Sequence, residues 1–266
     1  MLRSIKEMEG YAIGATDGTI GKVTNFYFDD LAWVIRYLVV ETGDWLSSRK
    51  VLISPIAIGQ LNRTERVLSV AITKEQVRSS PDVDTESPMS WQNEVRYLEH
   101  YGYPKYWGGT GIWGQGTLPS SLLSASRKGA GRATTAVAEE GERDDSLLRD
   151  CNAIMKYRIH ATDGDVGELC GLLVDEDFWA IRFLVVETGD WWAGHQMLIA
   201  TERIDEVDWP GASVAVDLTR QLIKDAPPYN STLRLDSREE TGIYQHLGRP
   251  GHRSGEAPRG PLRSRH

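Results

Sequence analysis

The octapeptide LVVETGDW at residues 38–45 occurs a second time, unchanged, at residues 184–191. The two copies are offset by 146 residues, and at this offset residues 2–104 align with residues 148–250 without a gap. Internal similarity over such a length indicates one structural module present twice. Each copy spans ~100 residues, which is enough for an independent hydrophobic core. The function must therefore be sought in this module or in the pair.

Shorter identities at the same offset show where the module turns. The tetrapeptide ATDG occurs at residues 15–18 and again at 161–164, between apolar runs. An Asp-Gly pair in this setting predicts a tight β-hairpin, because glycine accepts positive φ angles. The aspartates Asp17 and Asp163 are then turn residues whose side chains satisfy nearby backbone groups. The dipeptide Leu2-Arg3 also recurs, at residues 148–149.

The run from Trp33 to Thr42 predicts a strand, because it is rich in β-branched and aromatic residues. Its odd positions 35, 37 and 39 are apolar in both copies, so we expect that face to point into the core. The even face carries Arg36 but also Leu38 and Val40, with Leu184 and Val186 in the second copy. A strand that is apolar on both faces needs a cover on its outer side. We expect the two copies to hide these outer faces against each other as an internal pseudo-dimer.

Further short strands are predicted at residues 51–53 and 67–72, with a short helix at 74–78 capped by Thr73. A second helix is expected to begin at Ser90, in an aromatic extension. Several short strands with turn signals between them and a terminal helix indicate a small barrel. The predicted fold is all-β dominated: two small β-barrels in tandem, each followed by a short helical extension.

The expected domain organisation follows from this pattern and from composition. A linker rich in glycine and charged residues separates the copies, and its apolar Ile112, Trp113 and Leu118 indicate contact with a barrel. The predicted segments are barrel 1 at 1–82, an aromatic helical extension at 83–107, a flexible linker at 108–146, barrel 2 at 147–228, an extension at 229–250 and a disordered basic tail at 251–266.

Composition excludes several classes of protein. The formal net charge is −8 and the pI about 5.3, which disfavours a nonspecific nucleic-acid binder. No stretch approaches the ~20 apolar residues of a membrane helix, and the N-terminus does not resemble a signal peptide. The expected location is the cytoplasm of a bacterium. The two cysteines form neither a disulfide framework nor a zinc site.

The ordered set of motifs resembles the PRC-barrel domains, the small β-barrels of the photosynthetic reaction-centre H subunit and of the ribosome maturation factor RimM. The resemblance covers about residues 5–82 and 151–228. The residues that carry it are ATDG at 15–18, IGKV at 20–23, IRYLVV at 35–40 and LISP at 52–55, with DG at 163–164, VGEL at 166–169, IRFL at 181–184 and LI at 198–199 in the second copy.

The resemblance implies a fold rather than a reaction. In the H subunit the barrel caps a membrane complex and tunes electron transfer, and in RimM it docks an assembly factor on the ribosome. Both roles are those of an adaptor. This chain lacks the H subunit's N-terminal membrane helix, and Ala32 and Phe178, four residues before the Arg-Tyr/Phe-Leu triplets, are not carboxylates. The resemblance therefore implies a scaffold that binds a protein partner or a membrane-associated complex.

Candidate interaction residues come in pairs related by the repeat. The arginines at the centre of the predicted strand could form ion pairs with the following glutamate or with the partner barrel, or fork onto a ligand carboxylate or phosphate. The loop after that strand could be a turn with a tryptophan lid, a cation site or a recognition loop. The repeated histidine could cap a helix or titrate near neutral pH. These candidates are Arg36, Glu41, Asp44, Trp45 and His100, with Arg182, Glu187, Asp190, Trp191 and His246.

Catalytic motifs are missing from the sequence. It has no P-loop, dinucleotide fingerprint, nucleophile elbow or metal-ligand cluster. We therefore expect a non-enzymatic protein without cofactor or metal. Three alternatives to a plain scaffold remain open: an accessory protein of photosynthetic electron transport like the H subunit, a sensor of a small ligand or cation, and an RNA-linked assembly adaptor like RimM.

Overall fold

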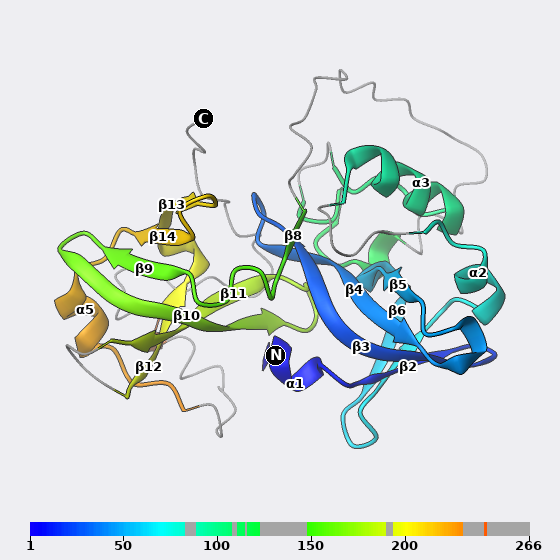
Figure 1. The fold of residues 1–266 in the computed structure, drawn as a ribbon, viewed down its shortest axis with the longest axis horizontal. Helices are drawn as coiled ribbons and strands as arrows, with labels where there is room; N and C mark the ends of the chain where they lie inside the picture. Colours follow the sequence, from blue (N-terminus) through cyan, green and yellow to red (C-terminus); the bar gives the residue numbers. More distant parts are fainter. Residues whose placement is uncertain are drawn as a thin grey trace. The chain divides into compact units, whose positions relative to one another are not determined.

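The computed structural model describes residues 1–82, 89–107, 111–114, 116–122, 148–189, 194–230 and 242–243. These residues are dominated by β-strands and form two compact units (Figure 1). The first-repeat unit consists of Met8–Asp30 and Val34–Cys151, and the second-repeat unit consists of Met1–Glu7, Leu31–Trp33 and Asn152–His266.

The first-repeat unit is built on one mixed sheet. Its strands lie in the order β5-β4-β3-β2-β7-β6, and β8 also pairs with β3. All neighbours are antiparallel except β2 and β7, which are parallel. The strands are β2 (Ala12–Ala15), β3 (Gly18–Asp29), β4 (Val34–Thr42), β5 (Lys50–Ile53), β6 (Ile58–Asn62), β7 (Val67–Val70) and β8 (Leu148–Asp150).

The second-repeat unit is built on a sheet of the same order. Its strands run β12-β11-β10-β9-β14-β13, and β1 also pairs with β10. The parallel pair is again the equivalent one, β9 with β14. The strands are β1 (Leu2–Ser4), β9 (Arg158–Ala161), β10 (Gly164–Asp175), β11 (Ile181–Thr188), β12 (Gln196–Ala200), β13 (Ile204–Asp208) and β14 (Ser213–Val216).

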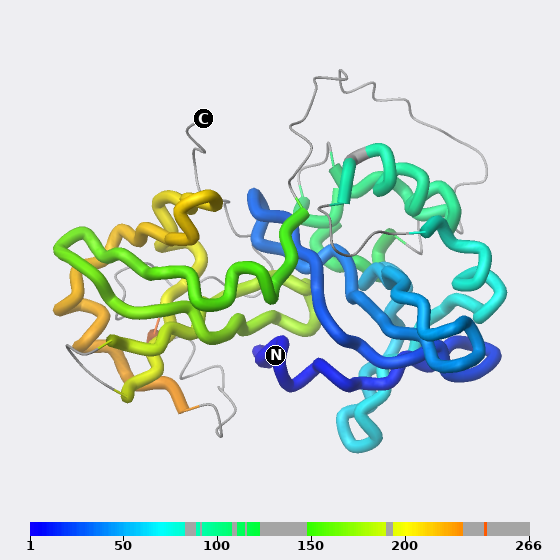
Figure 2. The backbone as a smooth tube through the Cα atoms, viewed as in Figure 1, coloured from blue at the N-terminus to red at the C-terminus, as the bar shows by residue number. Residues whose placement is uncertain are grey.

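The long hairpins β3–β4 and β10–β11 match in detail, and their course can be followed in Figure 2. Both first strands begin at the Asp-Gly glycine and contain twelve residues. Both second strands follow a tryptophan with positive φ, 53° at Trp33 and 58° at Trp179. The expected β-dominated fold is thus confirmed as two mixed sheets of equivalent topology.

The short helices begin at side-chain caps, as the sequence predicts. Thr73 and Gln76 form a capping box at the start of α2, and Ser90 caps α3. The aspartate of the first Asp-Gly pair also contributes to the start of a helix. Asp17 accepts a hydrogen bond at 2.8 Å from the backbone N–H of Lys74, the first residue of α2. The helices are α1 (Ile5–Met8), α2 (Lys74–Arg78), α3 (Trp91–Tyr101) and α5 (Arg220–Asp225), with 3-10 turns η1 (Asp44–Leu46), η2 (Pro55–Ala57) and η4 (Thr201–Arg203).

Strand β4 is buried on both faces, so a cover exists as expected. The packing of the even-numbered faces of the two copies against each other stays a prediction. Helix α3 covers the odd-numbered face, where the ring of Tyr37 meets the ring of Tyr97 edge to face at 4.9 Å. Leu38 of the other face lies opposite Phe26 and Ile53. Alternation along a strand separates its two faces but does not tell which of them faces the core.

Strands β1 and β8 occupy equivalent places in the two sheets, and each is the first strand of the other repeat. Leu2–Ser4 pairs with residues 173–175 of β10. Leu148–Asp150 pairs with residues 27–29 of β3. The repeated dipeptides Leu2-Arg3 and Leu148-Arg149 therefore mark one reciprocal strand exchange. Within the residues that the structure describes, no helix is both long and apolar enough to cross a membrane.

Candidate interaction site

Arg36 occupies a β-bulge in the middle of β4. Tyr37 lies opposite Tyr27, and Ile35 lies opposite Phe28, so Arg36 is the extra residue between two ladder pairs. A bulge interrupts strict alternation and changes the direction in which its side chain points. Arg36 is therefore not the outward-facing residue of a regular strand, and it is almost fully buried.

The guanidinium of Arg36 is enclosed by groups of its own unit. Nη2 donates to Oδ2 of Asp29 at 2.9 Å, and Nη1 donates to the carbonyl oxygen of Ile112 at 2.6 Å. Its central carbon lies 3.9 Å from the ring centre of Tyr106 and 4.7 Å from that of Trp113. A planar cation between aromatic faces and a carboxylate is a favourable arrangement for a buried arginine. The segment after α3 is thus fixed on this side chain.

Glu94 of α3 is a second buried charged group in the same place. Its Oε1 accepts hydrogen bonds from Tyr37, at 2.9 Å, and from Tyr106. Burial raises the pKa of Glu94 above its ordinary value, while the two tyrosine hydroxyls and the charge of Arg36 act in the opposite direction. The carboxyl joins strand β4, helix α3 and the segment that follows the helix.

Tyr97 fastens α3 to the sheet from the next turn of the helix. Its hydroxyl donates to the carbonyl oxygen of Leu52 at 2.8 Å and accepts from the backbone N–H of Ser54 at 3.2 Å. Tyr97 therefore holds the aromatic extension on the sheet. The buried aromatic residues of this extension are Tyr97, Tyr101, Tyr103 and Tyr106, and Trp113 of the following segment is also buried.

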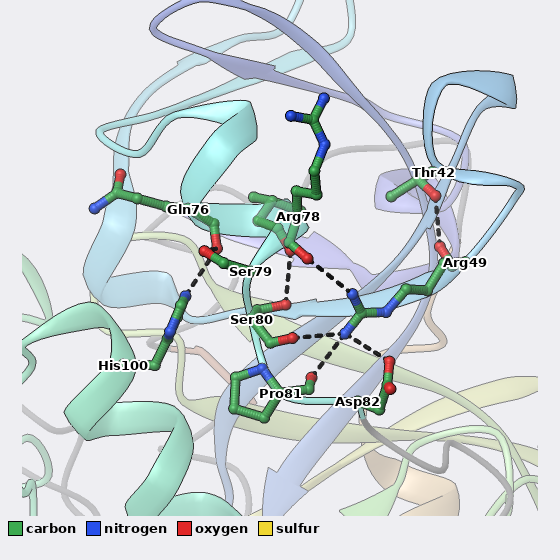
Figure 3. A network of polar contacts seen from close by, with 10 residues as sticks. Thr42, Arg49, Gln76, Arg78, Ser79, Ser80, Pro81, Asp82 and His100 are labelled. Atoms are coloured by element: carbon green, nitrogen blue, oxygen red, sulfur yellow. Dashed lines mark hydrogen bonds and ion pairs between the residues drawn. The ribbon is translucent and has the colours of Figure 1, made fainter.

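Arg49 organises the end of α2 in the same unit (Figure 3). Its guanidinium donates to the carbonyl oxygens of Arg78, Ser80 and Pro81 at 3.2, 2.8 and 3.0 Å. Asp82 completes the set with an ion pair of 2.9 Å. Carbonyls at the end of a helix lack partners within the helix, so a cation there is stabilising. His195 stands at the equivalent position of the second repeat, and the sequence interpretation overlooked Arg49.

His100 lies in the last turn of α3, which ends at Gly102 in the left-handed conformation. The imidazole, however, does not cap its own helix: Nε2 donates to the carbonyl oxygen of Gln76 in α2 at 2.8 Å (Figure 3). His100 therefore links two short helices of the first-repeat unit.

The loop after β4 holds Trp45 on the unit itself. The indole N–H donates to the carbonyl oxygen of Ile20 at 2.6 Å, and the ammonium of Lys74 lies 4.4 Å from the ring centre. Glu41 and Asp44 are exposed. The expected ion pair between Arg36 and Glu41 is wrong, because the bulge turns Arg36 toward Asp29. No group of three potential metal ligands occurs among the described residues.

In the second repeat, Arg182 is again the bulge residue. Phe183 pairs with Leu173 and Ile181 with Val174, which leaves Arg182 between them. The side chain is buried, and its central carbon lies 5.8 Å from the ring centre of Phe178. The other candidates of this repeat are placed as follows: Glu187 is exposed, whereas Asp190, Trp191 and His246 lie outside the described residues.

Equivalent ion pairs accompany the exchanged strands. Arg3 of β1 pairs with Glu176, which follows β10. Arg149 of β8 pairs with Asp30 at 2.9 Å, at the equivalent position after β3. Three of these four side chains are less than a tenth exposed, and Arg149 is 24% exposed. Breaking a buried pair by removing one partner typically costs ~3–5 kcal/mol, so these pairs are expected to matter for the exchange.

Asp30 should make the stability of the first-repeat unit depend on pH. Burial raises the pKa of Asp30 from 3.8 to about 6, against the lowering effect of Arg149. Because the folded pKa lies above the unfolded one, the stability contributed by Asp30 is complete below the unfolded pKa of 3.8 and is lost as the pH rises through about 6. Urea unfolding of the full chain at several pH values should show this decline, and D30N should reduce it. An unchanged slope in D30N would contradict the assignment.

The described residues form a β-rich module in which the buried Arg36 and the partly buried Arg49 bind segments of their own unit. Residues 3–77 match the family model for the PRC-barrel domain. The chain therefore carries a PRC-barrel domain in its first repeat. No curated protein matches the sequence.

The repeat itself carried a signal for Glu94 that the sequence interpretation overlooked. The residue 146 positions later is Glu240, so this carboxylate recurs just as His100 does. Glu240 lies outside the described residues. A buried role for Glu94 was nevertheless not evident, because a glutamate within a predicted helix is more often exposed.

The aromatic neighbours of Arg36 could not be found from repeat symmetry. Tyr106 and Trp113 have His252 and Arg259 at the positions 146 residues later, so these rings are not duplicated. A possible signal was the concentration of tyrosine and tryptophan between residues 97 and 113, which is unusual for a linker. Ile112 and Trp113 of the same linker are buried, whereas Leu118 is 39% exposed.

Proposed function

We propose that this protein is a non-enzymatic scaffold in which two PRC-type barrels are coupled by reciprocal strand exchange. The exchange carries the proposal: each sheet contains the first strand of the other repeat. A partner that binds one sheet is thereby coupled to the integrity of both repeats. The PRC-barrel match supports a role in protein interaction.

The use of charge supports a scaffold over a catalyst. Catalytic groups need to reach a substrate, whereas Arg36 and Arg49 each bind backbone carbonyls and a carboxylate of their own unit. The buried carboxyl of Glu94 is occupied by two tyrosine hydroxyls. These contacts fix the helical extension on the first sheet and present a rigid outer surface to a partner.

Affinity capture from the source organism with chemical cross-linking tests the scaffold. Wild-type chain should recover a reproducible partner, and R3E/R149E should lose it because both exchange ion pairs become repulsive. The matched control is R158E/K224E, which makes the same change in net charge at exposed positions and should retain the partner. Equal recovery by R3E/R149E, or turnover of a substrate by the purified chain alone, would contradict the proposal.

A further inference from the structure

The two bulge arginines have the same position in the fold but different surroundings. Arg36 has a carboxylate, a carbonyl oxygen and two aromatic rings as neighbours. Arg182 is only 6% exposed, yet its Nε and Nη1 have no hydrogen-bond partner in the part of the chain that the structure describes. Buried donors of a charged group are costly to leave unpaired. Among its described residues, the second repeat thus contains the bulge arginine but no hydrogen-bond acceptor for its Nε and Nη1.

The missing carboxylate has an identifiable cause. Asp175 is the counterpart of Asp29, but its Oδ1 accepts hydrogen bonds from the backbone N–H groups of Asp177 and Phe178 at 2.9 and 3.2 Å. Its Oδ2 lies 3.8 Å from the N-terminal amino group of Met1. Asp175 therefore closes its own turn, and in the described part of the chain it forms no ion pair with Arg182.

We propose that Arg182 is the docking residue for a partner-protein segment that presents a carboxylate beside an aromatic ring. This inference rests on the proposed scaffold function and names the chemistry of the partner. The guanidinium can bind a carboxylate through two parallel hydrogen bonds and stack on a ring at the same time. The half-buried ring of Phe178 lies beside it and offers an apolar contact for the incoming side chain.

The first repeat shows why a protein segment, rather than a free anion, fits this place. There the complement of Arg36 comes largely from one stretch of chain, which supplies the rings of Tyr106 and Trp113 and the carbonyl oxygen of Ile112. That stretch follows the sheet and is not part of it. In the second repeat, a partner protein would supply the equivalent stretch. It would also have to supply a carboxylate, because that of Asp175 is bound within its own turn.

Thermal unfolding of the full chain gives the first test. Replacing an unpaired buried cation by an apolar side chain of similar length should stabilise the free protein, whereas replacing a fully paired one should destabilise it. We expect R182M to raise the unfolding midpoint of the second-repeat unit and R36M to lower that of the first-repeat unit. A fall with R182M as large as that with R36M would mean that Arg182 is already satisfied within the chain and would overturn the inference.

Peptide binding to the full chain gives the second test. The probe is a blocked, fluorescent peptide with the sequence of residues 105–114 in which Asp replaces Ile112 (KYWGGTGDWG), and the control peptide has Asn at that position. We expect saturable binding of the Asp peptide, weakened about tenfold or more in R182Q and unchanged in R158Q, which alters an exposed arginine of the same unit. The Asn peptide should bind about as weakly to wild type as the Asp peptide binds to R182Q.

The outcomes separate this inference from the scaffold proposal. Absence of saturable binding up to about 1 mM peptide, or equal binding to wild type and R182Q, overturns the role of Arg182 whether or not cross-linked partners are captured. Loss of partner capture in R3E/R149E together with normal capture in R182Q would leave the scaffold intact and remove Arg182 from its interface. Folding of R182Q is checked by its circular dichroism before either comparison.

Discussion

Cutting the chain between its repeats should leave the two fragments associated. A protease site introduced near residue 130 separates a fragment that carries β1 and the first sheet from one that carries β8 and the second sheet. Because β1 pairs with β10 and β8 pairs with β3, each fragment still holds a strand of the other. We expect the cleaved protein to elute from a size-exclusion column at the volume of the intact chain.

The same cut in the R3E/R149E background provides the contrast. Loss of two buried ion pairs at ~3–5 kcal/mol each approaches the ~8 kcal/mol that corresponds to micromolar binding. The fragments that carry R3E and R149E should therefore separate on the column at low micromolar concentration, while the fragments that carry R158E and K224E stay together. Separation of the unsubstituted fragments would show that the exchanged strands do not hold the two repeats together.

A single methyl group at Gly21 should disrupt the first sheet. A Cβ built there would lie 2.0 Å from the carbonyl oxygen of Glu41 in the paired strand, and the equivalent Cβ at Gly167 would lie 1.9 Å from that of Glu187. Backbone cannot yield as a flexible side chain does, so strands β3 and β4 would have to move apart. We expect G21A to lower the free energy of unfolding of its unit by about 3 kcal/mol or more.

Gly43 offers the matched control for G21A. It lies at the end of the same hairpin, and a Cβ there would meet nothing within 4 Å. Urea denaturation of G43A should give a midpoint close to that of the wild-type chain. Equal midpoints for G21A and G43A would mean that the close approach of the two strands is not a property of the protein in solution.

Local signals in the sequence were sufficient for the elements themselves. The strand predicted at 33–42 is β4 at Val34–Thr42, and the helix caps lie at Thr73 and Ser90. Each of these depends on neighbouring residues: β-branched runs, a hydroxyl before a helix, an Asp-Gly pair. The duplication then predicted that both sheets would share one topology.

Such local signals could not predict contacts between segments that are distant in the sequence. A bulge is not visible in a pattern of alternating residues, so Arg36 was assigned to a regular strand and to the wrong carboxylate. The exchanged strands contain only three residues each, too few for a periodic pattern, and their repeated dipeptide showed similarity without showing pairing. The cover on β4 came from α3, whose sequence indicates a helix but not the surface on which it packs.

Strand exchange also fixes the order in which this protein can complete its fold during synthesis. Leu2–Ser4 of β1 pair with residues 173–175 of β10, which are synthesised much later than β1 itself. At the usual 5–20 residues per second, they wait roughly ten to thirty seconds for a template. Until residues 173–175 have been synthesised, strand β1 therefore lacks its partner strand and the second sheet cannot be completed.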